Sequence, residues 1–187
     1  MGRKKNKEYY AVFSGRVDEP TIFSSWGDAH PRVTGCEAVM KGFASIEKAR
    51  QYMKELGISE CKEVIKETAL NTTPANNDTA YYAVAYGSEG PCIKPYWYGD
   101  KGAFEETDKA PYACHKHFRT EAQAEAFIED WKEAYAEVIY RAVKEGFSKG
   151  MKPRDLKLNL VESLFEEPSD HDIEEIGETF SSQLTLA

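Results

Sequence analysis

The chain has no run of apolar residues long enough to cross a bilayer, so we expect no membrane partner. Its first residues, Met1–Asn6, are polar and lack the hydrophobic segment of a secretory signal. The four cysteines are scattered and form no Cys-x-x-Cys pair, so neither a disulfide framework nor a structural zinc site is indicated. These absences favour a cytoplasmic protein with reduced thiols, and a nuclear location is the alternative.

The sequence also lacks the common catalytic patterns. It contains no Gly-x-Ser-x-Gly, His-Glu-x-x-His or phosphate-loop pattern, and no set of strand-borne aspartates that could hold two metal ions. The closest approach to a metal site is His115-x-His117 beside Cys114, since two such imidazoles share one face of a strand. Because no second ligand pair exists, we interpret this segment as a surface strand, and we expect no cofactor and no enzymatic activity.

Positive charge is scarce in most of the chain, whose formal net charge is −8. Residues 1–67 carry 12 Lys and Arg against 10 Asp and Glu, whereas residues 68–130 carry 5 against 10 and residues 131–187 carry 7 against 12. A protein that neutralises many phosphates is normally basic. Only the first third of the chain keeps a balance that suits a polyanionic partner.

What the sequence does have is an internal repeat. Tyr-Tyr-Ala-Val occurs at Tyr9–Val12 and at Tyr81–Val84, and each copy is followed by a glycine turn, a tryptophan, a Lys-x-Phe run and an amphipathic helix. Such a repeat predicts two related units, and units of about 50 residues should pack on one another or on extra helices. The corresponding positions are Gly15 and Gly87, Trp26 and Trp97, Lys41-Gly42-Phe43 and Lys116-His117-Phe118, and the helix caps Ser45 and Thr120.

Strand-like and helical segments follow one another in the same order in both copies, which predicts an α+β fold with two tandem small domains and C-terminal helices. The second helix is expected to run from Thr120 to about Lys144, and its apolar stripe needs a partner to pack against. That partner is either a last helix over residues 153–166, where residues 156–161 also alternate as in a strand, or a second protomer. The expected segments are a first repeat at 8–67, a linker at 68–80, a second repeat at 81–130, a helical extension at 131–167 and a flexible acidic tail at 168–187.

The first repeat resembles the hybrid-binding domain at the N-terminus of eukaryotic ribonuclease H, a module also found in the viroplasmin protein of caulimoviruses. The resemblance covers residues 8–56 well and residues 80–130 more loosely. It implies a three-stranded antiparallel sheet packed on helices in each copy, and sequence-independent binding of double-stranded RNA or RNA–DNA hybrid. It rests on Tyr9-Tyr10-Ala11-Val12, Gly15-Arg16, Ser25-Trp26, Val33-Thr34-Gly35 and Lys41-Gly42-Phe43-Ala44-Ser45.

The resemblance also implies a set of binding residues in each copy. Met40 stands where the family has an aromatic residue, and Gly42 replaces a second lysine of the family pattern. His115 and His117 hold the corresponding places in the second copy. The implied nucleic-acid-binding residues are Arg16, Trp26, Met40 and Lys41 in the first repeat, and Trp97, His115, Lys116 and His117 in the second.

Two functions remain open at this stage. The first is weak, non-catalytic binding of double-stranded RNA or RNA–DNA hybrid, mainly through Trp26 beside Lys41. The second is a protein-interaction module that has lost its nucleic-acid face and self-associates through the helix over Phe127–Val143. Trp26 and Trp97 fit a core position as well as a binding position, so they do not decide between the two.

Overall fold

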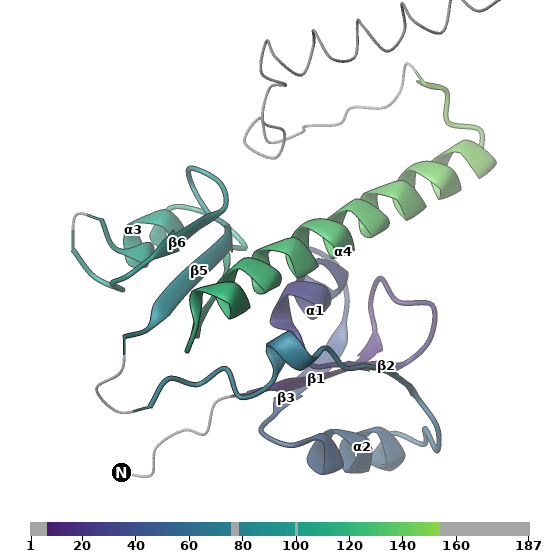
Figure 1. Cartoon of the computed structure of the whole chain (residues 1–187). Coiled ribbons are helices and arrows are strands. Elements are labelled where there is room, and N and C mark those ends of the chain that lie inside the picture. Colours follow the sequence, from purple (N-terminus) through teal and green to yellow (C-terminus); the bar gives the residue numbers. More distant parts are fainter. Residues whose placement is uncertain (1–6, 76–78, 100, 154–187) are drawn as a thin grey trace, which may run out of the picture. The chain divides into compact units, whose positions relative to one another are not determined.

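Two sheets with helices packed against them make up the part of the chain that the structure, a computed structural model, describes (Figure 1). The described residues are 7–75, 79–99 and 101–153, and all of them lie in one compact unit, Met1–Lys157. The α+β fold class is confirmed. In chain order the elements are β1 (Tyr9–Ser14), β2 (Thr21–Phe23), α1 (Trp26–Val33), β3 (Val39–Phe43), α2 (Ile46–Glu55), β4 (Lys62–Val64), the short 3₁₀ helix η1 (Glu67–Ala69), β5 (Tyr81–Tyr86), β6 (Cys92–Lys94), α3 (Ala103–Asp108), β7 (Cys114–Phe118) and α4 (Glu121–Ser148).

The first sheet has four strands in the order β3-β1-β2-β4, not the three that the sequence predicts. The strands β3, β1 and β2 are antiparallel, and β4 adds to the edge of β2 in parallel. This fourth strand has only three residues, Lys62–Val64, and two of them are charged. So short a segment carries no readable alternation, which is why the sequence did not predict it.

Strand β1 is buried on both faces because a helix covers each side of the first sheet (Figure 1). Successive side chains of a strand point to opposite faces, so alternate residues enter two different cores. The α1 side holds Tyr10, Val12, Phe23 and Ala29, and the α2 side holds Ala11, Ile22, Ala49 and Met53.

The second sheet repeats the first in strand order and register. Its order β6-β5-β7 corresponds to β2-β1-β3, and all of its pairs are antiparallel. The register shift near the end of the central strand also occurs at the equivalent position in both sheets. The matched features are Tyr10–Gly42 with Tyr82–His117, Ala11–Lys41 with Ala83–Lys116, and the register shifts at Val12/Ser14 and Val84/Tyr86.

The glycine turn after the central strand is also built in the same way twice. A Cβ atom at Gly15 would lie 2.6 Å from the carbonyl oxygen of Arg32, and one at Gly87 would lie 2.9 Å from that of Glu106. The amide after each glycine donates to that same carbonyl, at 2.8 and 2.9 Å. Both turns therefore need glycine, because the chain approaches the following helix too closely for any side chain.

Helix α4 joins the two repeats into one body. It begins after Thr120, whose hydroxyl accepts a hydrogen bond from the amide of Gln123 at 3.3 Å, as the capping pattern predicts. It crosses the expected boundary at residue 130 without a break. A Cβ atom at Gly27 of α1 would lie 2.6 Å from the carbonyl oxygen of Phe127, so the two helix backbones are in close contact.

This packing covers part of the surface over Phe127–Val143 that is expected to self-associate. Phe127, Trp131 and Val138 are buried within the chain, and Trp131 is only 2% exposed. The Trp131 indole N–H donates to Nδ1 of His30 at 3.4 Å. The first repeat, rather than a second protomer, thus covers the apolar stripe of α4 in its N-terminal half.

Ion pairs add to the contact between the repeats. The Lys66 ammonium lies 2.6 Å from Oδ1 of Asp130 and 3.2 Å from Oδ2 of Asp28. Burial, with the nearby Asp130, raises the pKa of Asp28 to about 6 despite Lys66. Arg32 also pairs with Glu137 across the same interface.

The remaining expectations concern the segments between and after the repeats. The linker at 68–80 begins inside η1, and its Ala69 and Thr72 are buried, so it is anchored to the folded unit. The expected last helix at 153–166 and the acidic tail at 168–187 lie outside the described residues, apart from Pro153. Within the described ranges, no helix combines the length and apolarity of a membrane span.

Candidate nucleic-acid interface

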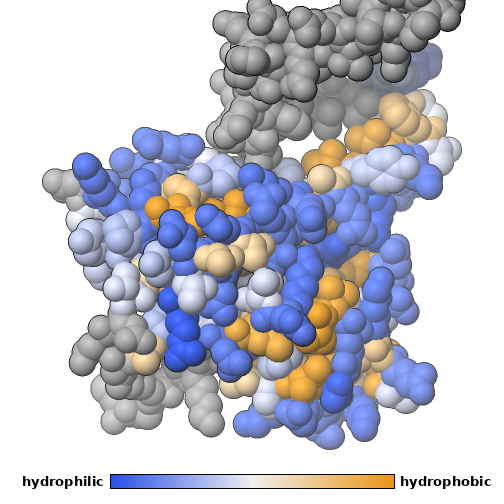
Figure 2. Space-filling model, viewed as in Figure 1, coloured by the Kyte–Doolittle hydropathy of each residue, from blue (hydrophilic) through white to orange (hydrophobic). Residues whose placement is uncertain are grey.

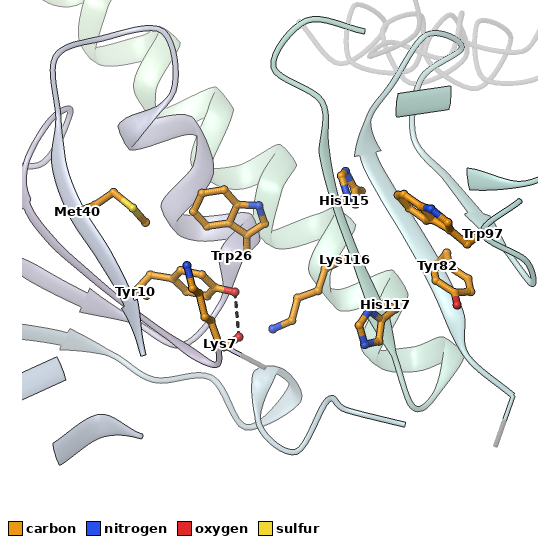
Figure 3. Close-up of a pocket in the computed structure, with 10 residues that line it drawn as sticks. Lys7, Tyr10, Trp26, Met40, Tyr82, Trp97, His115, Lys116 and His117 are labelled. Carbon is orange, nitrogen blue, oxygen red and sulfur yellow. Dashed lines mark hydrogen bonds between the residues drawn. The ribbon is translucent and has the colours of Figure 1, made fainter. Parts of the chain in front are cut away.

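A groove of about 550 Å³ lies between the two repeats, and both contribute to its walls (Figure 3). The first repeat supplies residues from β1, β3, the start of α1 and the segment before β1. The second supplies residues from β5, β7 and the segment after β6. The lining residues are Lys7, Tyr10, Trp26, Met40, Gly42, Tyr82, Trp97, His115, Lys116 and His117.

Each wall carries a tyrosine–tryptophan pair at equivalent positions of the repeat. The rings of Tyr10 and Trp26 have centroids 4.9 Å apart, and those of Tyr82 and Trp97 are 5.7 Å apart. All four residues line the groove, and both indoles are half-buried. The indoles therefore fit both a core position and a binding position, because each packs within its repeat and also lines the groove.

Local structure sets the orientation of the Trp26 ring. Ser25 precedes α1 in an extended conformation, and Trp26 is the first residue of the helix. Its ring packs against the ring of Tyr10 in β1. The ring makes an edge contact with His30, one turn further along α1, at 5.3 Å between centroids. The hydroxyl of Tyr10 donates to the carbonyl oxygen of Lys7 at 3.1 Å, which holds Lys7 beside the groove (Figure 3).

Lys116 supplies a positive charge at the junction of the two walls. It belongs to the second repeat, but its ammonium lies 5.8 Å from the ring centroid of Tyr10 in the first repeat. Burial lowers the pKa of Lys116 to about 8, against the opposing effect of Glu8. A cation held this way over an aromatic ring and partly out of water is ready to pair with an anion.

Lys41 does not accompany Trp26, which corrects the predicted pairing of this indole with Lys41. Its ammonium lies over the rings of Tyr52 and Phe43, at 5.2 and 5.6 Å from their centroids, on the α2 side of the sheet. Met40 and Gly42 of β3 line the groove, whereas Lys41 between them does not. Lys41 instead lines a shallow surface hollow with Glu47, among other residues.

Arg16 is also placed away from the groove. Its guanidinium donates to the carbonyl oxygens of Pro31, Thr34 and Gly35, at 2.9, 2.6 and 3.0 Å. These carbonyls lie at the C-terminal end of α1, where helix carbonyls lack partners within the helix. Arg16 is therefore occupied in closing α1.

The structure brings the other six predicted residues together in the groove. His115 contacts the Trp97 ring at 5.0 Å between centroids, and burial together with the charge of Lys116 lowers the pKa of His117. Sequence reasoning missed Lys7, Tyr10, Gly42 and Tyr82 as lining residues. The repeated Tyr-Tyr dipeptide could have indicated Tyr10 and Tyr82, since the two tyrosines occupy equivalent positions in the two repeats. The six residues are Trp26, Met40, Trp97, His115, Lys116 and His117.

The groove offers stacking surfaces and cations rather than metal ligands. Among the described residues, no group of three or more His, Cys, Asp and Glu side chains is placed to hold a metal ion. Aromatic faces can stack on bases or sugars, and ammonium groups can pair with phosphates. This combination is typical of sites for nucleic acids.

Comparison with known proteins agrees with this reading for the first repeat. Residues 8–53 match the family model of the ribonuclease H1 N-terminal domain. Neither the comparison with curated proteins nor that with solved structures gave a match. The matched segment runs from the residue before β1 into α2, so it contains Tyr10, Trp26 and Met40 of the groove. The first repeat is thus similar to a ribonuclease H1 N-terminal domain.

Proposed function

We propose that this protein binds double-stranded RNA or RNA–DNA hybrid without sequence specificity and without catalysis. The observation that carries the proposal is the shared groove, where aromatic side chains of both repeats lie with Lys7 and Lys116. The match of residues 8–53 to the ribonuclease H1 N-terminal domain supports the choice of ligand. The second repeat is on this account a diverged copy of the first, in agreement with its three strands, whose order and register match those of β2, β1 and β3.

The charge of the groove sets the expected affinity. Each lysine that engages a phosphate releases counterions, so affinity rises with the number of such contacts and falls with salt. With Lys7 and Lys116 as its two lysines, the groove should bind a duplex in the non-specific range of about 10⁻⁴–10⁻⁶ M. Duplex RNA and hybrid share 2′-hydroxyls in a wide, shallow minor groove, so we expect both to bind better than duplex DNA.

Fluorescence anisotropy at low salt tests the proposal with labelled hybrid, duplex RNA and duplex DNA. Lys116→Ala should weaken hybrid binding and reduce the salt slope by about one phosphate contact. Lys41→Ala is the matched control, because this lysine occupies the same station of the first repeat but lies outside the groove. Equal loss in both variants, or no binding of hybrid by the wild-type chain, would contradict the proposal.

A second candidate is self-association through the C-terminal half of α4 and the residues that follow it. Here Tyr140, Phe147 and Met151 are 67%, 42% and 39% exposed, in contrast to the buried N-terminal half. Figure 2 shows hydrophobic side chains at the surface near this end of the helix. Sedimentation of the chain over a range of concentrations distinguishes this function from the first.

A further inference from the structure

The volume of the groove limits what can enter it. The two walls meet where the Lys116 ammonium contacts the Tyr10 ring, 5.8 Å from its centroid. The open space of about 550 Å³ is much smaller than a duplex, whose major groove alone is about 12 Å wide. A duplex can lie across the mouth, but only a single nucleotide or strand can reach the interior.

The volume of the groove suits one such nucleotide. A space of about 550 Å³ falls within the range of about 300–1,000 Å³ that is usual for pockets that enclose a small ligand. The lining is largely aromatic, and Figure 3 shows Trp26 on one side of the strand that carries His115, Lys116 and His117 and Trp97 on the other. Every nucleobase has a flat face that can stack on an aromatic ring, whatever its sequence.

The Trp97 side is already ordered as a stacking surface. Its indole makes edge contacts with Tyr98 and Phe104, at 6.3 and 6.2 Å between centroids, and a tilted contact with His115 at 5.0 Å. These neighbours restrict the rotation of the ring while it stays half-buried on the groove side. Because the ring is already held in place, a base that binds there costs little further side-chain entropy, which favours binding.

The charge of the lining points to an anionic ligand. The chain carries 32 acidic residues against 24 basic ones, yet none of the described residues that line the groove is Asp or Glu. Two lysines supply its positive charge, since burial lowers the pKa of the two histidines that also line it. This local reversal of charge complements a phosphate group and disfavours a purely apolar ligand.

From these observations we propose that the groove holds an unpaired nucleotide at the end of a duplex. Its base stacks on Trp97, and its phosphate pairs with Lys116 and Lys7. The inference rests on the proposed function, since the paired part of the ligand lies across the mouth of the same groove. It adds a preference for duplexes that carry a short single-stranded end.

The preference can be measured with two hybrids that differ only in one end. One is blunt, and the other carries a three-nucleotide single-stranded RNA extension at its 3′ end. The wild-type chain should bind the extended hybrid at least about fivefold more tightly, which corresponds to one base–aromatic stack. Trp97→Ala should remove this preference, and Trp97→Phe should keep most of it because an aromatic face remains.

Tryptophan fluorescence gives a second readout that does not depend on how well a variant folds. The extended hybrid should quench the wild-type emission, because a base stacks on the half-buried Trp97, while the buried Trp131 remains unaffected. Trp97→Phe should lose part of that quenching and retain binding. Equal affinity for the blunt and extended hybrids, with no added quenching, would overturn the inference and leave the proposed function intact. Absence of binding to either hybrid would overturn both.

Discussion

At the scale of single residues, the groove depends on a lysine that one repeat places against a ring of the other. The ammonium of Lys116 lies over Tyr10, in surroundings that lower its pKa to about 8. Glu8 opposes this shift, and His117 beside it has a lowered pKa as well. Lys41 holds the equivalent position in the first repeat. It lies over Phe43 as Lys116 lies over Phe118, both at 5.6 Å, but its second ring is Tyr52 of its own repeat. The two equivalent lysines therefore differ in their second ring contact.

The lowered pKa of Lys116 predicts pH-dependent binding. A phosphate stabilises the charged ammonium and raises its pKa in the complex, so binding above about pH 8 requires uptake of a proton. The affinity for hybrid should fall by up to about tenfold per pH unit between pH 8 and pH 9.5, where His117 is already neutral. Anisotropy titrations across this range measure the slope.

Lys116→Arg is the control for that profile. A guanidinium stays protonated throughout, so the variant should bind hybrid with little change between pH 8 and pH 9.5. A wild-type affinity that does not change with pH, or an equally steep profile for the variant, would show that Lys116 does not contact the ligand.

At the scale of elements, helix α4 has two halves with different roles. Its first half packs against α1, and its Trp131 stacks on Tyr86 and Tyr135, at 5.8 and 4.9 Å between centroids. Beyond Val138 the helix extends past this contact, where Tyr140 and Phe147 are exposed. The apolar stripe of α4 is continuous in the sequence, but it is buried only as far as about Val138.

Two substitutions in α4 should therefore act differently. Trp131→Ala removes a core side chain and should lower the free energy of unfolding by about 3–5 kcal/mol, measured by chemical denaturation. Phe147→Glu should leave that free energy within about 0.5 kcal/mol, because the side chain is exposed. If the chain self-associates, Phe147→Glu should shift sedimentation toward the monomer. A large loss of stability in Phe147→Glu, or a small one in Trp131→Ala, would contradict this division of the helix.

Several elements could be predicted from local sequence, and others could not. The caps Ser45 and Thr120 gave the starts of α2 and α4, because capping depends on neighbouring residues. Strand β4 and helix α3 were missed, because three and six residues carry too little periodicity. The composition of α4 gave its apolar stripe but not which surface covers it, since packing between distant segments is not encoded locally.

At the scale of the whole molecule, the two repeats pack against each other and both line the groove. Six residues that the sequence predicted as binding residues line the groove, and they were found by comparing equivalent positions of the two Tyr-Tyr-Ala-Val segments. The sequence could not predict that the groove lies between the copies, which depends on the contacts of Lys66 and α4 with α1. For the same reason Lys41 and Arg16 were assigned to a surface that they do not reach.

The central claim is that both repeats contact one nucleic-acid ligand through this groove. The most direct measurement is a titration with RNA–DNA hybrid that follows the three tryptophan indole N–H signals by NMR. The account predicts that the signals of Trp26 and Trp97 shift together over the same range of ligand concentration, while that of Trp131, hydrogen-bonded to His30, stays in place. A shift of Trp26 alone, or of neither groove indole when hybrid is bound, would contradict it.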